Sequence, residues 1–437
     1  MISEHLLGWI TLLIIILITF SIVNKNPKTI NFLFVALFLR SICVIVDQYL
    51  FPLPGSSMDA WTFEQFAFDF SQRYGLDVVH QLLDGDSYFL SKIISIFYTL
   101  IDRSSFMAKM FSVGFGTAAV FLIYRLTLIL WGTNAALKAG WFAAFFPSLV
   151  LYSALIMREI YVVFFLTYAL ICCVNFIDKR KVIYFIKSFF GFYIAALFHG
   201  PLILGFFIFL IYLFVKILRE NNYFLNYKKK NIYALLLLPV ILIPFVTYFL
   251  GYYSIPKIGN IKDFGESKTI IIKNVGGKMV KVIPVDQTEL LTDFEERIIW
   301  KMNKSRDQCH FAVCAASYPE WTVPKNIEQL SYLIPVRMFY LLYAPFPWDI
   351  KRTTHLVGLF DAIFYIYLSF CIFRNRKSLY KNPQTLFLLI ILIMYIGAYS
   401  LGVGNFGTGL RHRLKFIGIL IAIAAPTILR IKFFKIK

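Results

Sequence analysis

The sequence predicts an all-α polytopic membrane protein with about 11 transmembrane helices, because long apolar stretches dominate it and basic clusters alternate between them. Hydrophobic residues make up 59% of its 437 residues and charged residues only 16%, whereas soluble proteins carry about 25% charged residues. Most of the Lys and Arg behind the net charge of +20 lies in short connections beside apolar stretches, where it sets orientation and meets anionic lipid. This positive charge therefore does not indicate nucleic-acid binding.

The expected spans are apolar stretches separated by polar, glycine or proline residues. They cover residues 6–23, 30–50, 111–131, 139–156, 160–177, 183–199, 202–218, 232–252, 354–373, 384–401 and 414–430. Every second connection is basic: Lys25/Lys28, Lys138, Lys179-Arg180-Lys181, Lys216/Arg219 with Lys228-Lys229-Lys230, Arg374/Arg376/Lys377/Lys381, and the tail Lys432/Lys435/Lys437. Because basic loops stay in the cytoplasm, we expect the N-terminus outside and the C-terminus inside.

The alternation divides the chain into three parts. Residues 1–253 are expected to form an N-terminal transmembrane bundle, and residues 254–333 a small mixed extracytoplasmic loop domain. Residues 334–437 hold a re-entrant or interfacial segment followed by the last transmembrane helices. That segment, 334–348, contains three prolines, and a full crossing there would reverse the charge alternation of the last spans.

Short helices and one hairpin are expected in the outer connections. The outer loop 51–110 carries two amphipathic patterns, near 59–74 and 87–101, which are typical of interfacial helices. In the loop domain, residues 268–285 alternate around Gly276-Gly277 and predict a β-hairpin. An amphipathic helix is expected at 286–303.

Acidic residues of the first outer loop are candidates for general-base catalysis. Asp59 and Asp86 begin the two interfacial helices, and a carboxylate at the mouth of a cavity can remove a proton from an acceptor hydroxyl. The alternative for each is an N-cap of its helix. Glu64, one turn further along, is a candidate substrate contact.

The connection before the last expected span, Gly402–Arg413, combines four glycines with Arg411, His412 and Arg413. Glycines let backbone approach a ligand closely, and arginines offer forked, permanently charged donors suited to phosphate. On the outer face of a membrane, a phosphate ligand indicates a lipid-linked pyrophosphate or phosphosugar. The alternative is a glycine-rich turn whose arginines extend to lipid headgroups.

Further polar residues near the outer boundary belong to the same candidate site. Arg158 and Glu159 lie where two spans meet with almost no loop, as either a substrate contact or a structural salt bridge. Arg337 is another candidate for phosphate. His199, before Gly200-Pro201, either contacts substrate or ends a broken helix.

Two charged residues fall inside expected spans. Arg40 lies near mid-depth and Asp361 about two turns into its span. Charges at such depth need partners. We expect the two to pair with each other or with other buried polar groups.

Cys309 and Cys314 lie close together in the expected outer domain. In an oxidising compartment they either form a disulfide or stay reduced and pack as small hydrophobic residues. No second Cys/His pair completes a zinc site, so the sequence assigns no metal ligand, and a divalent metal has no support.

An acid soon after a span, two interfacial helices and a bundle with a large late outer domain resemble the GT-C class of membrane glycosyltransferases. The resemblance covers the arrangement of residues 30–250 and implies a catalytic acid in the first outer loop, which maps to Asp59. The Asp-Glu pair familiar in that class is absent, since Ala60 follows Asp59. In length and span number the chain also resembles Wzy-type polymerases of O-antigen and capsule assembly, whose outer-loop arginines hold undecaprenyl-pyrophosphate glycans.

Both resemblances imply glycosyl transfer at the outer face of the bacterial cytoplasmic membrane. The donor would be a sugar or glycan on undecaprenyl-(pyro)phosphate, and a hydroxyl would displace the lipid (pyro)phosphate at the anomeric carbon. The implied partners are membrane lipids, the lipid-linked glycan and other proteins of polysaccharide assembly. No cofactor besides the donor is implied.

The alternative is a transporter or flippase of lipid-linked oligosaccharide. Transporters place polar residues near the bilayer midplane, on broken helices in repeated halves. Here the polar residues concentrate at the outer boundary, and no halves repeat. The sequence therefore favours transfer, and it predicts that the first outer loop, the Arg158-Glu159 corner and Arg411-His412-Arg413 converge on one outward-facing cavity.

Overall fold

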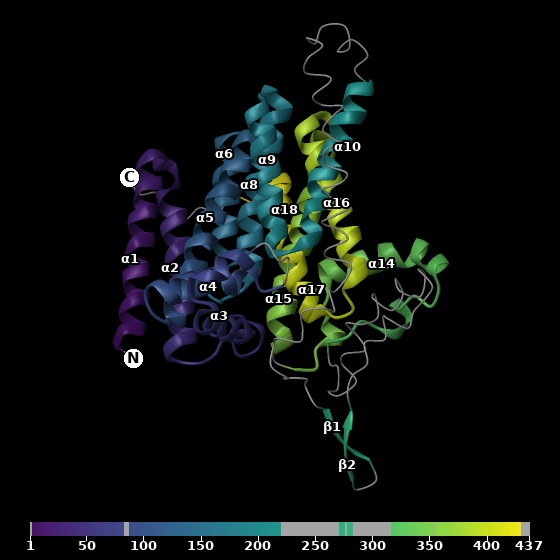
Figure 1. Cartoon of the computed structure of the whole chain (residues 1–437). Helices are drawn as coiled ribbons and strands as arrows, with labels where there is room; N and C mark the ends of the chain where they lie inside the picture. Colours follow the sequence, from purple (N-terminus) through teal and green to yellow (C-terminus); the bar gives the residue numbers. More distant parts are fainter. Residues whose placement is uncertain are drawn as a thin grey trace.

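The computed structural model describes residues 2–82, 87–219, 271–275, 278–282, 316–352 and 354–429. Its long helices run side by side as a bundle (Figure 1). Among the described residues, six helices are long and apolar enough to cross a membrane: α1 (Ile2–Lys25), α2 (Ile30–Tyr49), α5 (Ser105–Trp131), α8 (Arg158–Lys179), α15 (Thr354–Lys381) and α16 (Pro383–Gly402). The described part of the chain is an all-α polytopic membrane bundle with one added β-hairpin.

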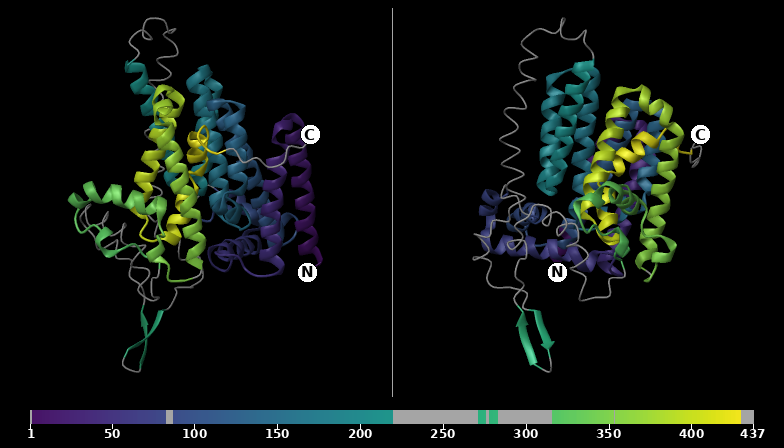
Figure 2. Two further views of the ribbon diagram at one scale, coloured as in Figure 1. Left: turned by 180° about the vertical axis from the view of Figure 1, so that it is seen from behind. Right: turned by 90° about the vertical axis from the view of Figure 1, so that its right-hand side faces the viewer.

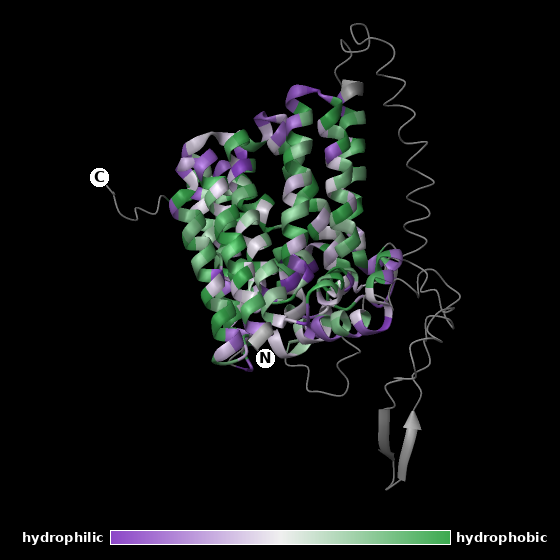
Figure 3. Ribbon diagram, turned by 60° about the vertical axis from the view of Figure 1, so that its left-hand side comes forward, coloured by the Kyte–Doolittle hydropathy of each residue, from purple (hydrophilic) through white to green (hydrophobic). Residues whose placement is uncertain are grey.

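The two ends of the bundle differ in their connections. We call the end that carries the first long connection, residues 50–104, the loop end, and the opposite end the basic end. Helices α1, α8 and α15 all finish at the basic end, with Lys25, Lys179 and Lys381 in their last turns. Figure 3 shows hydrophobic residues along the middle of the helices and hydrophilic ones toward both ends. This distribution suits a bilayer around the middle of the bundle.

The interior of the bundle is built on α8 and α18 (Ile417–Ala424). Every residue of α18 is buried, and α8 is far more buried than α1, which lies at the rim. Small residues allow close packing: a Cβ atom on Gly418 would lie 2.6 Å from Oγ1 of Thr167, and one on Gly191 of α9 (Val182–Phe198) would lie 2.8 Å from Cβ of Ala169. Such contacts are typical of helix interfaces in membranes.

Several expected spans are broken or short. The span predicted at 139–156 is α6 (Thr133–Phe145) followed by α7 (Pro147–Ser153), bent by 58°. Phe146 is extended because it precedes a proline. The spans predicted at 183–199 and 202–218 correspond to α9 and α10 (Leu204–Arg219), which are joined by the 3₁₀ turn η4 (Gly200–Ile203). A similar turn, η1 (Pro27–Thr29), joins α1 to α2.

Two short helices lie crosswise at the loop end, α3 (Trp61–Tyr74) and α4 (Phe89–Leu100) (Figures 1 and 2). They match the two helices expected in the first outer loop. The Ser91 hydroxyl donates to the Phe63 carbonyl at 2.7 Å and ties them together. A five-residue π turn, η2 (Ser56–Ala60), precedes α3, and the 3₁₀ segment η3 (Gly75–Gln81) follows it.

The segment expected to be re-entrant forms α14 (Leu330–Tyr343), with Pro335 inside it. Its 14 residues rise about 21 Å, less than the ~30 Å of hydrocarbon. The helix packs against α16 and α17 (Phe406–Leu414). Three 3₁₀ turns flank it: η6 (Glu320–Thr322), η7 (Ile327–Gln329) and η8 (Pro347–Asp349).

The glycine-rich connection Gly402–Arg413 is not a loop throughout, because a short extended stretch, Val403 to Asn405, is followed by the helix α17. The Asn405 side chain accepts from the Thr408 backbone N–H at 2.7 Å and begins α17, as an N-cap residue does. The last expected span, 414–430, contains the short buried helix α18, which begins at Ile417, after α17 ends at Leu414. Lys415 and Phe416 occupy the break, where Phe416 stacks on Tyr395.

The predicted hairpin is present in strands β1 (Ile271–Val275) and β2 (Lys278–Val282), which pair antiparallel with Ile271 opposite Val282. Other expectations lie outside the described residues: the span at 232–252, the helix at 286–303, Asp86, and the cysteines Cys309 and Cys314.

Candidate functional site

The first long connection and α17 meet at an ion pair between Asp59 and Arg411. Asp59 lies in η2, which the chain enters through Gly55 at a φ of +92°, a conformation that favours glycine. The side chains of Arg411 and Asp59 are 29% and 49% exposed. Ala60, not Asp59, occupies the N-cap position of α3. The N-cap alternative for Asp59 is therefore wrong, and its carboxylate faces another element.

A buried polar cluster adjoins this pair. The Tyr399 hydroxyl and His199 Nδ1 are 2.8 Å apart, and the His412 ring meets the His199 ring edge-on at 5.3 Å between centroids. The Lys415 ammonium lies 3.2 Å from His412 Nδ1. We call the following residues the polar cluster: Arg158, Glu159, His199, Tyr399, His412 and Lys415.

Helix ends and breaks position the cluster. Arg158 and Glu159 are the first two residues of α8, and His199 stands in the break between α9 and η4. Lys415 follows the last residue of α17. The Arg158 guanidinium lies 5.9 Å from the ring centre of Phe63 on α3, so α3, α8 and α17 come together at the loop end. The structure thus brings Asp59, which was predicted from the first outer loop, to the predicted residues of the later segments.

Two side chains of the polar cluster have donors or acceptors without a hydrogen-bond partner. Within the described part of the chain, Arg158 makes no hydrogen bond or ion pair, and the Oε2 atom of Glu159 has no hydrogen-bond partner. Glu159 is only 3% exposed. A buried carboxylate oxygen without a partner is costly. This corner is therefore not the structural salt bridge considered from the sequence.

The two histidines are neutral at pH 7. Burial, and then the charges of Lys415, Arg411 and Arg158, lower the pKa of His412 well below 6.5. Burial and the charges of Lys415 and His412 lower the pKa of His199 in the same way. Neutral imidazoles can donate and accept hydrogen bonds at once.

Arg413, two residues after Arg411, has a different environment. Its side chain is fully buried and pairs with Asp361 at 2.8 Å. Its remaining donors reach the carbonyls of Leu342, Ala344 and Gly358. All five N–H groups of a guanidinium are then used. The predicted phosphate role of Arg413 is contradicted, since no donor is left for a ligand.

The partners of the buried charges are now defined. Asp361 pairs with Arg413 and accepts from the Ser148 backbone N–H at 3.1 Å. Arg40 does not pair with Asp361. It donates to the Ser153 hydroxyl at 3.2 Å and to backbone carbonyls of residues 36, 143 and 144. The expectation of buried polar partners is confirmed, and direct pairing of Arg40 with Asp361 is wrong.

Arg337 also serves the fold. It is buried on α14 and donates to four carbonyls, those of Thr322, Ser400, Leu401 and Val403, at 2.8 to 3.1 Å. These bonds close the end of α16, whose last carbonyls lack helical partners. With four of five donors used, the predicted phosphate role of Arg337 is not supported.

Glu64 holds the first long connection together. Arg103 donates to both of its carboxylate oxygens, at 3.0 and 2.8 Å, and the Tyr98 hydroxyl donates at 3.1 Å. The hydrogen bond to Glu64 raises the pKa of the Arg103 guanidinium. The predicted substrate contact of Glu64 is replaced in this structure by a bond between α3 and the start of α5.

Sequence reasoning missed Lys415 and Tyr399. Lys415 is the second residue of the apolar stretch assigned to the last span, and a charge inside an expected span is itself a signal of function. Tyr399 carried no such signal, because tyrosine is common near membrane boundaries. Only the folded chain places its hydroxyl on His199.

The arrangement can hold an anion beside a carboxylate. Two guanidiniums, Arg158 and Arg411, stand beside two carboxylates, Asp59 and Glu159, and the buried Lys415 amine adds hydrogen-bond donors. Within the described part of the chain the Arg158 side chain has no ion-pair partner, so its guanidinium can bind an anion such as phosphate. Among the described residues no group of three His, Cys, Asp or Glu could hold a metal ion. No protein-family model matches the sequence, and no curated protein matches it, so the geometry carries the functional argument.

Proposed function

We propose that this protein transfers a sugar or glycan from an undecaprenyl-(pyro)phosphate carrier to an acceptor hydroxyl, in surface polysaccharide assembly at the outer face of the bacterial cytoplasmic membrane. The supporting observation is the Asp59–Arg411 pair. It puts a partly exposed carboxylate and a partly exposed guanidinium side by side, next to the polar cluster with its Arg158 guanidinium. A glycosyl-transfer site needs a general base close to a cationic side chain that binds the donor phosphate.

The chemistry follows from the two partners. Asp59 takes the proton of the acceptor hydroxyl, the oxygen attacks the anomeric carbon, and the bond from that carbon to the phosphate oxygen breaks. Arg411 and Arg158 stabilise the departing phosphate. Without a donor, Arg411 holds Asp59. A donor phosphate competes for Arg411 and releases the carboxylate, which links donor binding to activation of the base.

The finer topology belongs to the same proposal. We propose eleven spans, with the loop end outside and the basic end in the cytoplasm. The lysines that close α1, α8 and α15 at one end support this orientation. Cysteines introduced at exposed positions such as Trp61 should react with an impermeant thiol reagent in intact cells. Labelling only after the cells are opened would overturn the orientation.

The decisive experiment uses two matched substitutions. Asp59→Asn and Arg411→Ala should each abolish sugar addition to a lipid-linked acceptor in proteoliposomes, while Asp69→Asn, an exposed acid on α3, should keep activity. Full activity in both site variants would reject the assignment. Movement of unmodified lipid-linked glycan across the bilayer by the purified protein, without sugar transfer, would indicate a flippase.

A further inference from the structure

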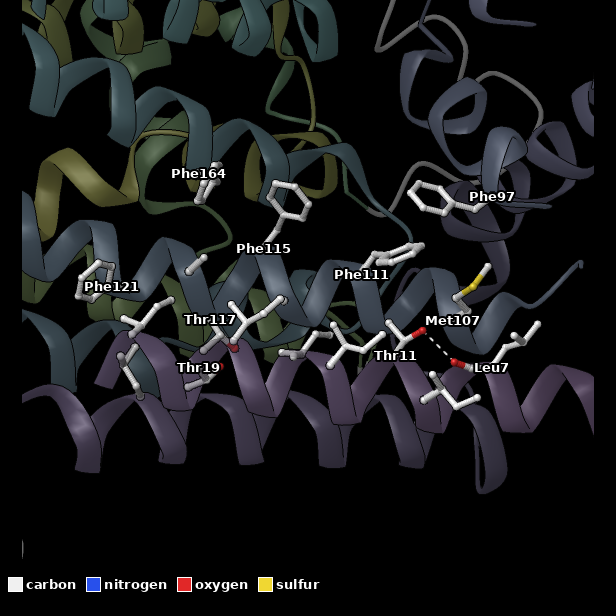
Figure 4. Close-up of a pocket in the computed structure, with 18 of the residues that line it drawn as sticks. Leu7, Thr11, Thr19, Phe97, Met107, Phe111, Phe115, Thr117, Phe121 and Phe164 are labelled. Carbon is white, nitrogen blue, oxygen red and sulfur yellow. Dashed lines mark hydrogen bonds between the residues drawn. The ribbon is translucent and has the colours of Figure 1, made fainter. Parts of the chain in front are cut away.

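A second site lies away from the polar cluster, in an apolar groove of about 480 Å³ between α1 and α5. Figure 4 shows Phe111, Phe115 and Phe121 of α5 along it, with Phe97 and Phe164 across from α1. All residues that line it are apolar apart from a few threonines. The groove is therefore a hydrocarbon-lined recess between two helices that can span a membrane.

The groove has the dimensions of a lipid chain. On α1 its lining runs from Leu7 to Ile22, which corresponds to about 22 Å of helix. Empty apolar space forfeits van der Waals contacts along its walls. In a bilayer, lipid acyl chains lie beside α1 and can fill the groove.

A polar cavity of about 360 Å³ lies at the loop end of the same two helices. Glu4 lines it three residues before Leu7 of the groove, and Ser105 two residues before Met107. Glu64, Arg103 and Lys109 complete its charged lining. The two hollows are thus consecutive along α1 and α5, with the polar one at the expected membrane boundary.

This cavity contains charges of both signs. Arg103 pairs with Glu64 at 2.8 Å, and Lys109 pairs with Asp47 at 2.8 Å. The Ser105 hydroxyl donates to the Glu4 carboxylate at 2.9 Å. Three carboxylates, Glu4, Glu64 and Asp47, accompany two cations, Arg103 and Lys109, so the cavity has no surplus of positive charge. A group that carries both signs fits the cavity better than an anion does.

We infer that groove and cavity together bind one zwitterionic phospholipid, with an acyl chain between α1 and α5. Its phosphate lies at Arg103 and Lys109, and its ammonium lies at Glu4. The lipid fastens α1, the least buried of the long helices, to the rest of the bundle. This inference does not depend on glycosyl transfer.

Native mass spectrometry after reconstitution in nanodiscs tests the site. With equal amounts of phosphatidylethanolamine, phosphatidylglycerol and undecaprenyl phosphate, the wild type should retain one phosphatidylethanolamine per chain. Ala118→Trp, which fills the groove, should lower retention at least tenfold. Leu17, whose side chain is 60% exposed on α1, lies outside the groove, and Leu17→Trp should leave phosphatidylethanolamine retention unchanged. Equal retention in the two variants, or none in the wild type, would overturn the site.

Two further measurements cover the headgroup and the fold. Glu4→Gln keeps a side chain that can accept from Ser105 but removes the charge, so it should shift retention from phosphatidylethanolamine toward phosphatidylglycerol. Preferential retention of undecaprenyl phosphate by the wild type would refute the headgroup assignment. If Ala118→Trp does not fold, a diazirine-bearing phosphatidylethanolamine decides: crosslinks to α1 and α5 support the site, and crosslinks elsewhere reject it.

Discussion

Arg411 and Arg413 stand two residues apart on α17 and have opposite environments. Arg411 is partly exposed and held by one carboxylate, Asp59, which is itself half exposed. Arg413 is fully buried and uses every donor on Asp361 and three carbonyls. Residues i and i+2 of a helix point to different sides. One arginine is therefore available to a ligand, while its neighbour joins α14, α15 and α17.

The largest expected effect falls on the buried pair. Arg413→Ala should lower the free energy of unfolding by about 3–5 kcal/mol, because it leaves the Asp361 charge buried and unpaired. Unfolding in detergent by steric trapping measures this. The double variant Arg413→Met with Asp361→Leu should lose less than the single variant. Equal losses would show that the charge pair is not the cause.

Acid should destabilise the protein through the polar cluster. The pKa values of His199 and His412 are lowered in the folded state, so below about 6.5, the ordinary histidine value, the unfolded chain binds more protons. The contribution of the two histidines to the free energy of unfolding is fully present above that pH and is lost as the pH falls below it. The slope of stability against pH should flatten in His199→Gln/His412→Gln, but not in the exposed control His80→Gln.

Glu64→Gln tests an intermediate case. It removes the charge from a bidentate bond to an arginine that is 38% exposed, so we expect a loss of about 1 kcal/mol. Thermal unfolding of the purified protein would report it. A loss as large as that of Arg413→Ala would show that exposure does not determine the rank of these pairs.

The smallest effect on stability is expected at the candidate site. Arg411→Ala and Asp59→Asn should each change the free energy of unfolding by less than about 1 kcal/mol, because an exposed ion pair contributes little. The same two variants should lose the proposed activity. If either variant unfolds as readily as Arg413→Ala, the contrast between the two arginines is wrong.

Much of the architecture was predictable because membrane insertion imposes strong local rules. Apolar length and basic connections located the long helices, and amphipathic spacing located α3 and α4. The breaks were harder to predict. Whether residues 402–413 form a loop or a helix depends on the Asn405 cap and on packing, which glycine content alone does not reveal.

The sequence by itself determined that the chain is a helical membrane protein, and it drew Asp59, Arg158, His199, Arg411 and His412 into one candidate set. Hydrophobicity and charge are properties of each segment, so they can be seen without a fold. Only the tertiary structure decided which charges face one another, because partners such as Arg413 and Asp361 lie 52 residues apart. The rotation of α17 separated a candidate ligand contact from a structural bond, and no local pattern specifies that rotation.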